Sequence, residues 1–469
     1  MGVAAPTVFP PAPAGRRARE LAVNSNLTIY WGSTVTSQQK AVLVQALSWM
    51  QKGGLAILDQ GLFAGTNFLA NVLLARWLEP AEYGVFAIAY SVFVFLATFH
   101  TALFTEPMLI FGAGKYAEHF PQYLRLLLYG HWGVTGMMAL LMVSAALLCW
   151  WGNAGALAHV LAALAFALPC ILLQWLVRRA FYVRFQPHWS ALGGVLYLVL
   201  MLAGLQGVHW LNGLSPASAL AIMGLASLVV GLALTVLLRS QQGPAIPRLM
   251  PHTVLADHWR YGKWASITTA STWVSREIYY PLLPVWTGLE GSAAVRALMN
   301  LVMPLLHTNA AITMLLMPRC VAALQVEGKA SLDRLLWLAF ILLATGAVLY
   351  WGVILVYRHT VMLWLYGGRY GDYTELLLLA GFLPLSEAAI NVLSAALRAA
   401  ERPDMVFWCH LVALSVTLTG GLWLLATRGV AGAIIGRLAA SLAVAMALLW
   451  FHTVPSVGDL VARSERRLG

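Results

Sequence analysis

Charged residues are scarce in this sequence. Only 10% of its 469 residues are Asp, Glu, Lys or Arg, whereas 60% are hydrophobic. A soluble domain is about one quarter charged, so this composition excludes an ordinary soluble protein. Apolar runs of about twenty residues, each long enough to cross a hydrocarbon core of about 30 Å, recur along most of the chain. The sequence therefore predicts an all-α polytopic membrane protein.

Cysteine pairs and the common catalytic motifs are absent as well. The cysteines lie far apart, inside or beside apolar runs, at Cys149, Cys170, Cys320 and Cys409. Without a C-x-x-C motif they indicate neither a metal site nor a disulfide framework, and we expect no cofactor. The sequence has no G-x-x-x-x-G-K-[ST], H-E-x-x-H or G-x-S-x-G motif. This argues against P-loop nucleotide hydrolysis and against the hydrolases that those motifs mark.

Apolar runs between charged and Pro/Gly-rich breaks predict about twelve membrane-spanning helices. About six precede the longest internal connection, residues 239–261, and about six follow it. The even division favours two six-helix bundles, residues 51–238 and 262–452, because many transporters place a substrate path between two such repeats. The predicted spans are 54–77, 84–105, 126–150, 154–177, 188–211, 216–238, 262–286, 292–317, 334–357, 374–397, 404–426 and 431–452.

The basic residues predict how the chain is oriented. If the N-terminus is cytoplasmic, 22 of the 29 Lys and Arg residues fall in cytoplasmic segments and five in extracytoplasmic ones. This asymmetry favours cytoplasmic ends for both tails, residues 1–50 and 453–469, in a bacterial inner membrane. The first tail is Pro/Ala-rich and we expect it to be flexible, although translation from Met50 is an alternative. The net charge of +11 comes from scattered residues and forms no basic stripe, so we expect no nucleic-acid binding.

The first predicted span, 54–77, is unusually polar. Gln60, Asn67 and Asn71 are spaced i, i+7 and i+11, which places them on one helix face within about 40°. Asp59 flanks this stripe. It lies a turn or two inside the predicted span, so it fits a charge at the helix N-terminus as well as a residue in a cavity.

Polar stripes recur in the second half of the chain. They include Arg276, Glu277 and Tyr280 in span 262–286, Arg296 and Asn300 in span 292–317, and Glu387 in span 374–397. A charge near the bilayer centre costs at least ~2.5–3.5 kcal/mol, so such residues usually face a bundle interior or an aqueous cavity. Stripes from several helices therefore predict one pathway for a hydrophilic solute. Structural roles stay open, because charged residues pair between helices, Asn side chains hydrogen-bond between helices, and an arginine near a span end, such as Arg296, snorkels.

An ordered series of motifs from about residue 55 to 450 resembles bacterial polysaccharide and oligosaccharide flippases. These form the O-antigen-flippase-like branch of the multidrug/oligosaccharidyl-lipid/polysaccharide exporter (MOP) superfamily. The motifs are "LLARWLEPAEYGVFAIA" (73–89), "ALFTEPMLIFG" (102–112), "HWRYGKW" (258–264), "AAVRALMNLVMPL" (293–305), a block at 365–404 that begins "LYGGRYGDYTELLLLAGF", and "RGVAGAIIGRLAAS" (428–441).

The resemblance implies two six-helix bundles around a central V-shaped cavity. It also implies an activity, which is to move polyprenyl-diphosphate-linked oligosaccharide to the outer leaflet for exopolysaccharide or O-antigen-type glycans. The family mechanism is alternating access, often coupled to a proton or sodium ion. The implied partners are the lipid-linked sugar, membrane lipid and a polysaccharide polymerase or export complex.

We combine this resemblance with the polar stripes to select candidate site residues. Arginine grips phosphate oxygens bidentately, and amide or aromatic side chains contact sugars. The candidates for diphosphate are Arg276 and Arg296, those for sugar are Asn67, Asn71, Asn300 and Tyr280, and those for ion coupling are Asp59, Glu277 and Glu387. Three alternative functions stay open. They are an ion-coupled small-molecule or drug antiporter of the same superfamily, a membrane ligase or polymerase, and an accessory role in a biosynthetic complex.

Overall fold

A computed structural model describes residues 37–240, 249–400 and 402–453 of the chain, and these residues form helices and turns with no strand among them. Most of the two predicted tails therefore lies outside the described residues. Residues Met1–Gln51 and Lys52–Gly469 are two separate units. The helix packing given below is that of the second unit.

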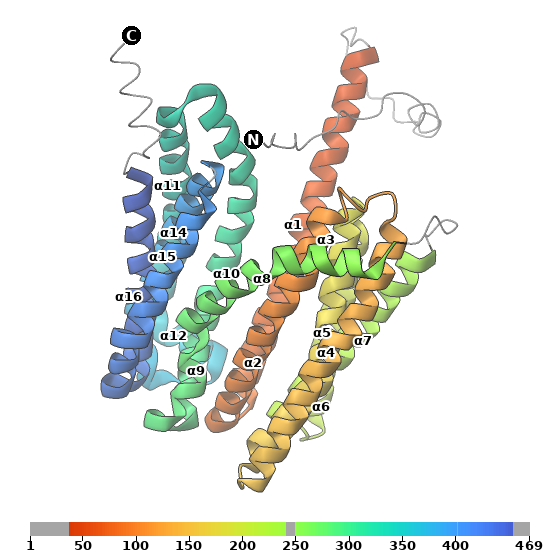
Figure 1. The fold of residues 1–469 in the computed structure, drawn as a ribbon. Coiled ribbons are helices and arrows are strands. Elements are labelled where there is room, and N and C mark those ends of the chain that lie inside the picture. The colour runs from red at the N-terminus through yellow and green to blue at the C-terminus, as the bar shows by residue number, and fades with distance from the viewer. Residues whose placement is uncertain (1–36, 241–248, 401, 454–469) are drawn as a thin grey trace, which may run out of the picture. The chain divides into compact units, whose positions relative to one another are not determined.

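The first half of the chain contains one helix that starts earlier than predicted and a series of long apolar helices (Figure 1). Its elements are α1 (Ser37–Trp77), α2 (Pro80–His100), the π-helical turn η1 (Thr101–Thr105), α3 (Glu106–Phe111), α4 (Phe120–Trp151), α5 (Gly155–Val183), α6 (Pro187–Trp210) and α7 (Pro216–Ser240). Helix α5 contacts α4, α6 and α7, and α2 also packs against α5.

The second half alternates long helices with short ones. Its elements are α8 (Pro251–Glu277), α9 (Tyr279–Leu282), α10 (Pro284–Ala322), η2 (Ala323–Glu327), α11 (Lys329–Val356), α12 (Arg358–Tyr366), η3 (Gly371–Leu376), α13 (Leu377–Ala380), α14 (Phe382–Ala399), α15 (Pro403–Val416), η4 (Thr417–Gly421) and α16 (Leu422–Thr453). Helix α14 packs against α10, α11, α15 and α16.

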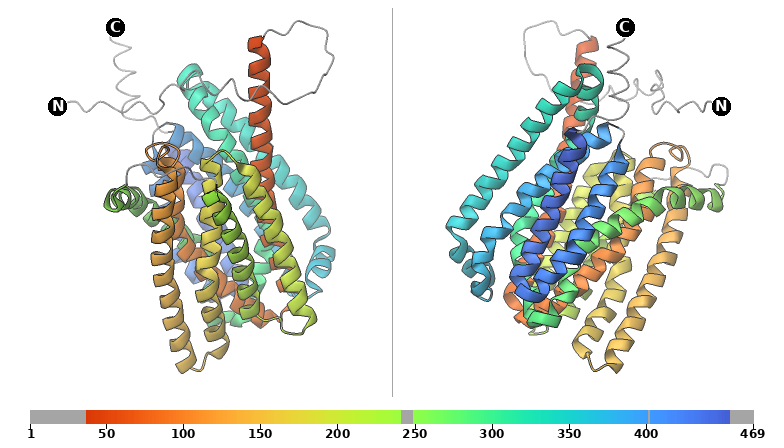
Figure 2. Two further views of the ribbon diagram at one scale, coloured as in Figure 1. Left: turned by 90° about the vertical axis from the view of Figure 1, so that its right-hand side faces the viewer. Right: turned by 60° about the vertical axis from the view of Figure 1, so that its left-hand side comes forward.

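Helices α2, α8, α9 and α10 join the two halves. Helix α2 packs along α10 and also contacts α8 and α9, while α8 contacts η1. Figures 1 and 2 show the first part of α8 running crosswise over the ends of neighbouring first-half helices. There, Asp257 accepts hydrogen bonds from Lys115 and Tyr116, at 2.5 Å each. His258 donates from Nδ1 to the Leu103 carbonyl oxygen at 2.7 Å.

Nine helices among the described residues are long and apolar enough to cross a membrane. They cover most of every predicted span except 54–77 and 262–286, and the 50-residue helical stretch Asp404–Thr453 contains two predicted spans. Gly429 separates these two, because its backbone angles of φ 55° and ψ −126° interrupt the helix in a region open to glycine. Spans 54–77 and 262–286 are therefore too polar to count among the nine apolar helices. They lie largely in α1 and α8 and carry prominent polar stripes.

The sequence around Pro80 explains how α2 comes close to α10. Glu79 and Glu82 form a capping box at the start of α2, and Pro80 occupies the first turn, where no amide hydrogen is needed. One turn later, a Cβ atom on Gly84 would lie 2.0 Å from the Leu289 carbonyl oxygen of α10. Only glycine permits this approach, which is typical of tightly packed membrane helices.

Candidate functional site

Polar side chains from both halves of the chain meet where α1 and α2 face α10. The Arg296 Nε atom donates a hydrogen bond to Asn71 Oδ1 at 3.1 Å, and Asn300 Nδ2 donates to the Tyr83 hydroxyl at 3.0 Å. The Arg296 guanidinium lies 4.2 Å from the centre of the Tyr90 ring. We call these five residues, together with Tyr280 of α9, the Arg296 cluster.

Five of the six residues of the Arg296 cluster are buried, and Tyr90 is partly buried. The side chains of Arg296, Asn71 and Asn300 are 2%, 4% and 3% exposed, and Tyr280 is 1% exposed with its ring centre 5.8 Å from the Arg296 guanidinium. The predicted alternative that Arg296 snorkels from a span end is therefore wrong. The two halves pack directly against each other at this cluster, where α2 lies along α10.

Arg296 carries a charge that no described carboxylate neutralises by an ion pair. Glu277 acts on it electrostatically at longer range, and the hydroxyls of Tyr83 and Tyr280 lie close to it. Aromatic faces and an amide oxygen stabilise a buried guanidinium but do not cancel its charge. The cluster thus has a net positive charge together with amide and hydroxyl groups, which is the chemistry of an anion site for a polyhydroxylated ligand.

Two further contacts join the halves next to this cluster. Arg76, in the last turn of α1, donates to the Trp364 carbonyl oxygen of α12 at 2.9 Å. Arg369, in the turn after α12, donates to the Leu78 carbonyl oxygen at 2.6 Å and pairs with Glu79 at 3.2 Å. Together with the Arg296 cluster, these contacts close the same end of the junction between the two halves.

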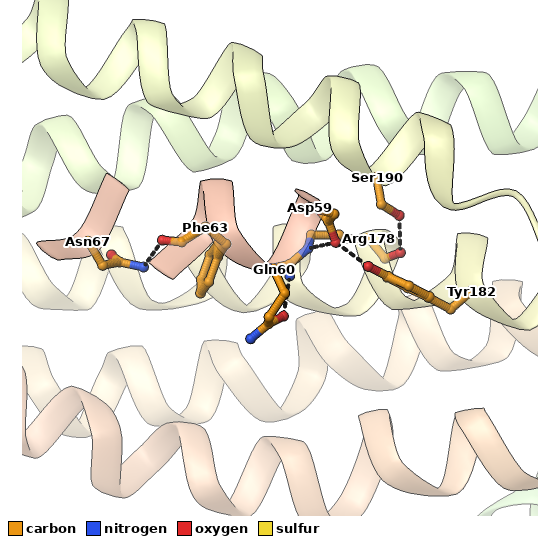
Figure 3. Close-up of polar contacts among 7 residues, drawn as sticks. All are labelled: Asp59, Gln60, Phe63, Asn67, Arg178, Tyr182 and Ser190. Carbon is orange, nitrogen blue, oxygen red and sulfur yellow. Dashed lines mark hydrogen bonds and ion pairs between the residues drawn. The ribbon is translucent and has the colours of Figure 1, made fainter. Parts of the chain in front are cut away.

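Asp59 belongs to a separate cluster inside the first half (Figure 3). Its Oδ2 atom accepts a hydrogen bond from Arg178 Nε of α5 at 2.8 Å and another from the Tyr182 hydroxyl. Arg178 also donates to Gln60 Oε1 at 2.9 Å, and its guanidinium lies over the Phe63 ring at 4.4 Å. Asp59 is fully buried and α1 begins at Ser37, so the predicted alternative of a charge at the helix N-terminus is wrong.

A third group of charges lies inside the second half. Arg276 of α8 pairs with Glu387 of α14 at 2.5 Å, and Arg437 of α16 donates to the Arg276 carbonyl oxygen at 3.2 Å. These residues and His410 line a small pocket of about 20 Å³. A cavity of this size holds about one water molecule, so it is too small for a sugar diphosphate.

The structure thus brings together four of the six predicted substrate residues, which are Arg296, Asn71, Asn300 and Tyr280. The other two lie elsewhere. Arg276 is held by Glu387, and Asn67 donates to the Phe63 carbonyl oxygen of its own helix at 3.0 Å. The placement of Arg276 and Arg296 in one diphosphate site is therefore not supported by this structure.

Several partners were missed from the sequence. Tyr83 and Tyr90 are spaced by seven residues, a helical repeat that puts both on one face of α2, and this signal could have identified them. Arg178 is the first of two adjacent arginines at the end of an apolar run, and Arg437 is a single arginine within one. No local pattern pairs either residue with its partner.

The described part of the chain contains no group of three or more His, Cys, Asp or Glu side chains placed to hold a metal ion. All four cysteines are free thiols.

No family model matches the sequence, and no curated protein matches it either. Solved structures do match. An inward-facing multidrug resistance MATE family transporter of the MOP superfamily has a TM-score of 0.70 and 13% identity, over 84% of this chain and 97% of that one. The outward-facing conformation of such a transporter has a TM-score of 0.64 and 16% identity, over 84% and 93%. The lipid II flippase MurJ in an inward closed conformation has a TM-score of 0.64 and 10% identity, over 89% of both chains.

These likenesses define the class of fold. The chain is an all-α, multi-pass membrane protein with the fold of MOP superfamily transporters. A multidrug resistance transporter and a lipid II flippase both have this fold, so the substrate has to be argued from the site itself.

Proposed function

We propose that this protein is a flippase that moves polyprenyl-diphosphate-linked oligosaccharide across the bacterial cytoplasmic membrane by alternating access. The oligosaccharide would serve an exopolysaccharide or O-antigen-type surface glycan. Both tails are then cytoplasmic, and the junction end closed by Arg76, Arg369 and the Arg296 cluster faces outward. The greater likeness to an inward-facing transporter than to an outward-facing one, with TM-scores of 0.70 and 0.64, supports this assignment of the closed end.

The observation that carries the proposal is the buried Arg296 without a carboxylate partner. A buried charge is retained at a cost of several kcal/mol, and that cost is offset when a ligand of opposite charge binds next to it. Arg296 joins helices of both halves, so a diphosphate that takes over its contacts would separate α10 from α1 and α2. Asn71, Asn300 and Tyr280 would then be free to hydrogen-bond to sugar hydroxyls.

Among the predicted coupling residues, Glu277 is the best placed. Asp59 and Glu387 are both neutralised by arginine at 2.8 Å and 2.5 Å. The Glu277 side chain is 9% exposed, and its Oε2 atom has no hydrogen-bond partner among the described residues. We propose that Glu277 takes up a proton or sodium ion, because it is buried, belongs to no ion pair among the described residues and has one carboxylate oxygen without a hydrogen bond.

The second candidate function is an ion-coupled antiporter of small or drug-like molecules. The likeness to a multidrug resistance transporter over 97% of its chain favours it. The charge of the Arg296 cluster argues against cationic drugs, because like charges repel in a site of low dielectric.

The test is to reconstitute the purified protein into liposomes and compare two substrates. One is a fluorescent polyprenyl-diphosphate oligosaccharide, and the other is a fluorescent organic cation driven by proton or sodium gradients. The proposal predicts flipping of the lipid-linked oligosaccharide and no uptake of the cation. Cation uptake without flipping would establish the antiporter and overturn the proposal.

A further inference from the structure

A groove in the first half of the chain shares no lining residue with the three polar clusters. It has a volume of about 430 Å³ and is formed by the first turns of α4, the last turns of α7 and α5 between them. Figure 1 shows these three helices side by side. A volume of this size falls in the range of about 300–1,000 Å³ that is typical of small-molecule sites.

The groove combines an apolar floor with a basic mouth. Leu128, Val177 and Leu238 line the floor and are 8%, 0% and 1% exposed. Arg125 of α4 and Arg239 of α7 also line the groove, and both are exposed. An apolar wall with charges at one end matches an amphiphile whose acyl chain enters the floor and whose headgroup lies at the mouth.

The two arginines have no acidic partner among the described residues. Neither belongs to any ion pair found there. The sequence that follows Arg239, residues 241–248, contains no Asp or Glu and adds a further basic residue, Arg248. The groove therefore carries two positive charges, which favour the binding of an anionic ligand.

From this combination we propose that the groove between α4, α5 and α7 binds an anionic phospholipid, with its phosphate on Arg125 and Arg239. Two guanidinium groups can each donate paired hydrogen bonds to phosphate oxygens. Basic pockets between membrane helices on the cytoplasmic side are suited to anionic headgroups. The bound lipid would anchor the first turns of α4 and the last turns of α7 in the leaflet that contains the anionic lipid.

The experiment is a lipid titration of the purified full-length protein by native mass spectrometry, with phosphatidylglycerol and phosphatidylcholine as probes. We expect phosphatidylglycerol to be retained at least tenfold more tightly. The double variant Arg125→Gln/Arg239→Gln should lose about 30-fold in affinity, at about fivefold for each basic residue near the membrane surface. A groove-filling variant, Thr235→Phe, keeps both charges and should also lose the lipid.

Two controls make the result decisive. The double variant Arg319→Gln/Arg334→Gln removes the same charge from exposed positions on α10 and α11 and should retain phosphatidylglycerol at wild-type affinity. Thermal unfolding checks that each variant is folded. The proposal is overturned if this control loses as much affinity as the groove variant, if the groove variants bind normally, or if inorganic phosphate alone binds and displaces the lipid.

Discussion

The substitution Asn71→Asp tests whether the Arg296 cluster is an anion site. It is nearly isosteric and places a carboxylate oxygen where Asn71 Oδ1 now accepts from Arg296 Nε at 3.1 Å. The cluster then changes from a net positive charge to neutral. The size and shape of the side chain at the contact between α1 and α10 stay almost the same.

Coulomb's law gives the size of the effect on binding. A new negative charge about 6 Å from a bound phosphate repels it by about 3 kcal/mol at an effective dielectric constant of 20, which is about 100-fold in affinity. The effect on stability is smaller. Asn71 Nδ2 loses its hydrogen bond to the Asn67 carbonyl oxygen, now 2.8 Å long, at a cost of about 1–3 kcal/mol, and the new ion pair with Arg296 offsets part of it.

The assay is quenching of the intrinsic fluorescence of the 19 tryptophans by a polyprenyl-diphosphate oligosaccharide in detergent. The stability of Asn71→Asp is measured separately by chemical unfolding, with Asn67→Asp as the control. Asn67→Asp breaks a similar hydrogen bond of 3.0 Å within α1, and Asn67 has no hydrogen bond to Arg296. If Asn71→Asp binds the diphosphate substrate with wild-type affinity, Arg296 does not hold the anion and the reasoning is refuted.

Three other predictions concern the remaining charges. Asp59→Asn leaves the buried Arg178 without its carboxylate and should destabilise the protein by about 3–5 kcal/mol in chemical denaturation, whereas a loss below about 1 kcal/mol would show that the pair is dispensable. In a double-mutant cycle, Arg276→Gln and Glu387→Gln should show a coupling of about 1 kcal/mol, reduced because the Arg276 side chain is 36% exposed, and strict additivity would contradict the contact. Burial lowers the pKa of His258, against the raising effects of its hydrogen bond to Leu103 and of Asp257. The unfolded chain therefore binds the proton first, and stability should fall as the pH drops below about 6.5. His258→Gln should remove this dependence between about pH 5 and 7, and an unchanged pH profile would assign it to another group.

The membrane helices could be predicted from the sequence because hydrophobicity is a local signal. An apolar run of about twenty residues needs no distant partner to form a helix in a bilayer. The helix ends were less predictable. Helix α1 begins at Ser37, in a weakly patterned segment, and Arg358–Tyr366 forms the short helix α12 where a loop was predicted.

The candidate site could be predicted only in part. The helical repeat placed Asn71, Arg296 and Asn300 on polar faces, and the structure brings those faces together. Ion-pair partners depend on tertiary packing, so they could not be predicted. Arg178 is 119 residues from Asp59, and Glu387 is 111 residues from Arg276. Without knowledge of these partners, charges held in ion pairs could not be distinguished from charges available to a substrate or a coupling ion.

The most direct measurement of the central claim is flipping of two fluorescent oligosaccharide lipids in proteoliposomes. One lipid has a polyprenyl diphosphate and the other an uncharged polyprenyl linkage, and both are tested with the wild-type protein and with Arg296→Gln. The account predicts that the wild-type protein flips the diphosphate lipid at least tenfold faster than the uncharged one, and that Arg296→Gln removes this preference. Equal flipping of both lipids by the wild-type protein, or a preference that survives in Arg296→Gln, would contradict it.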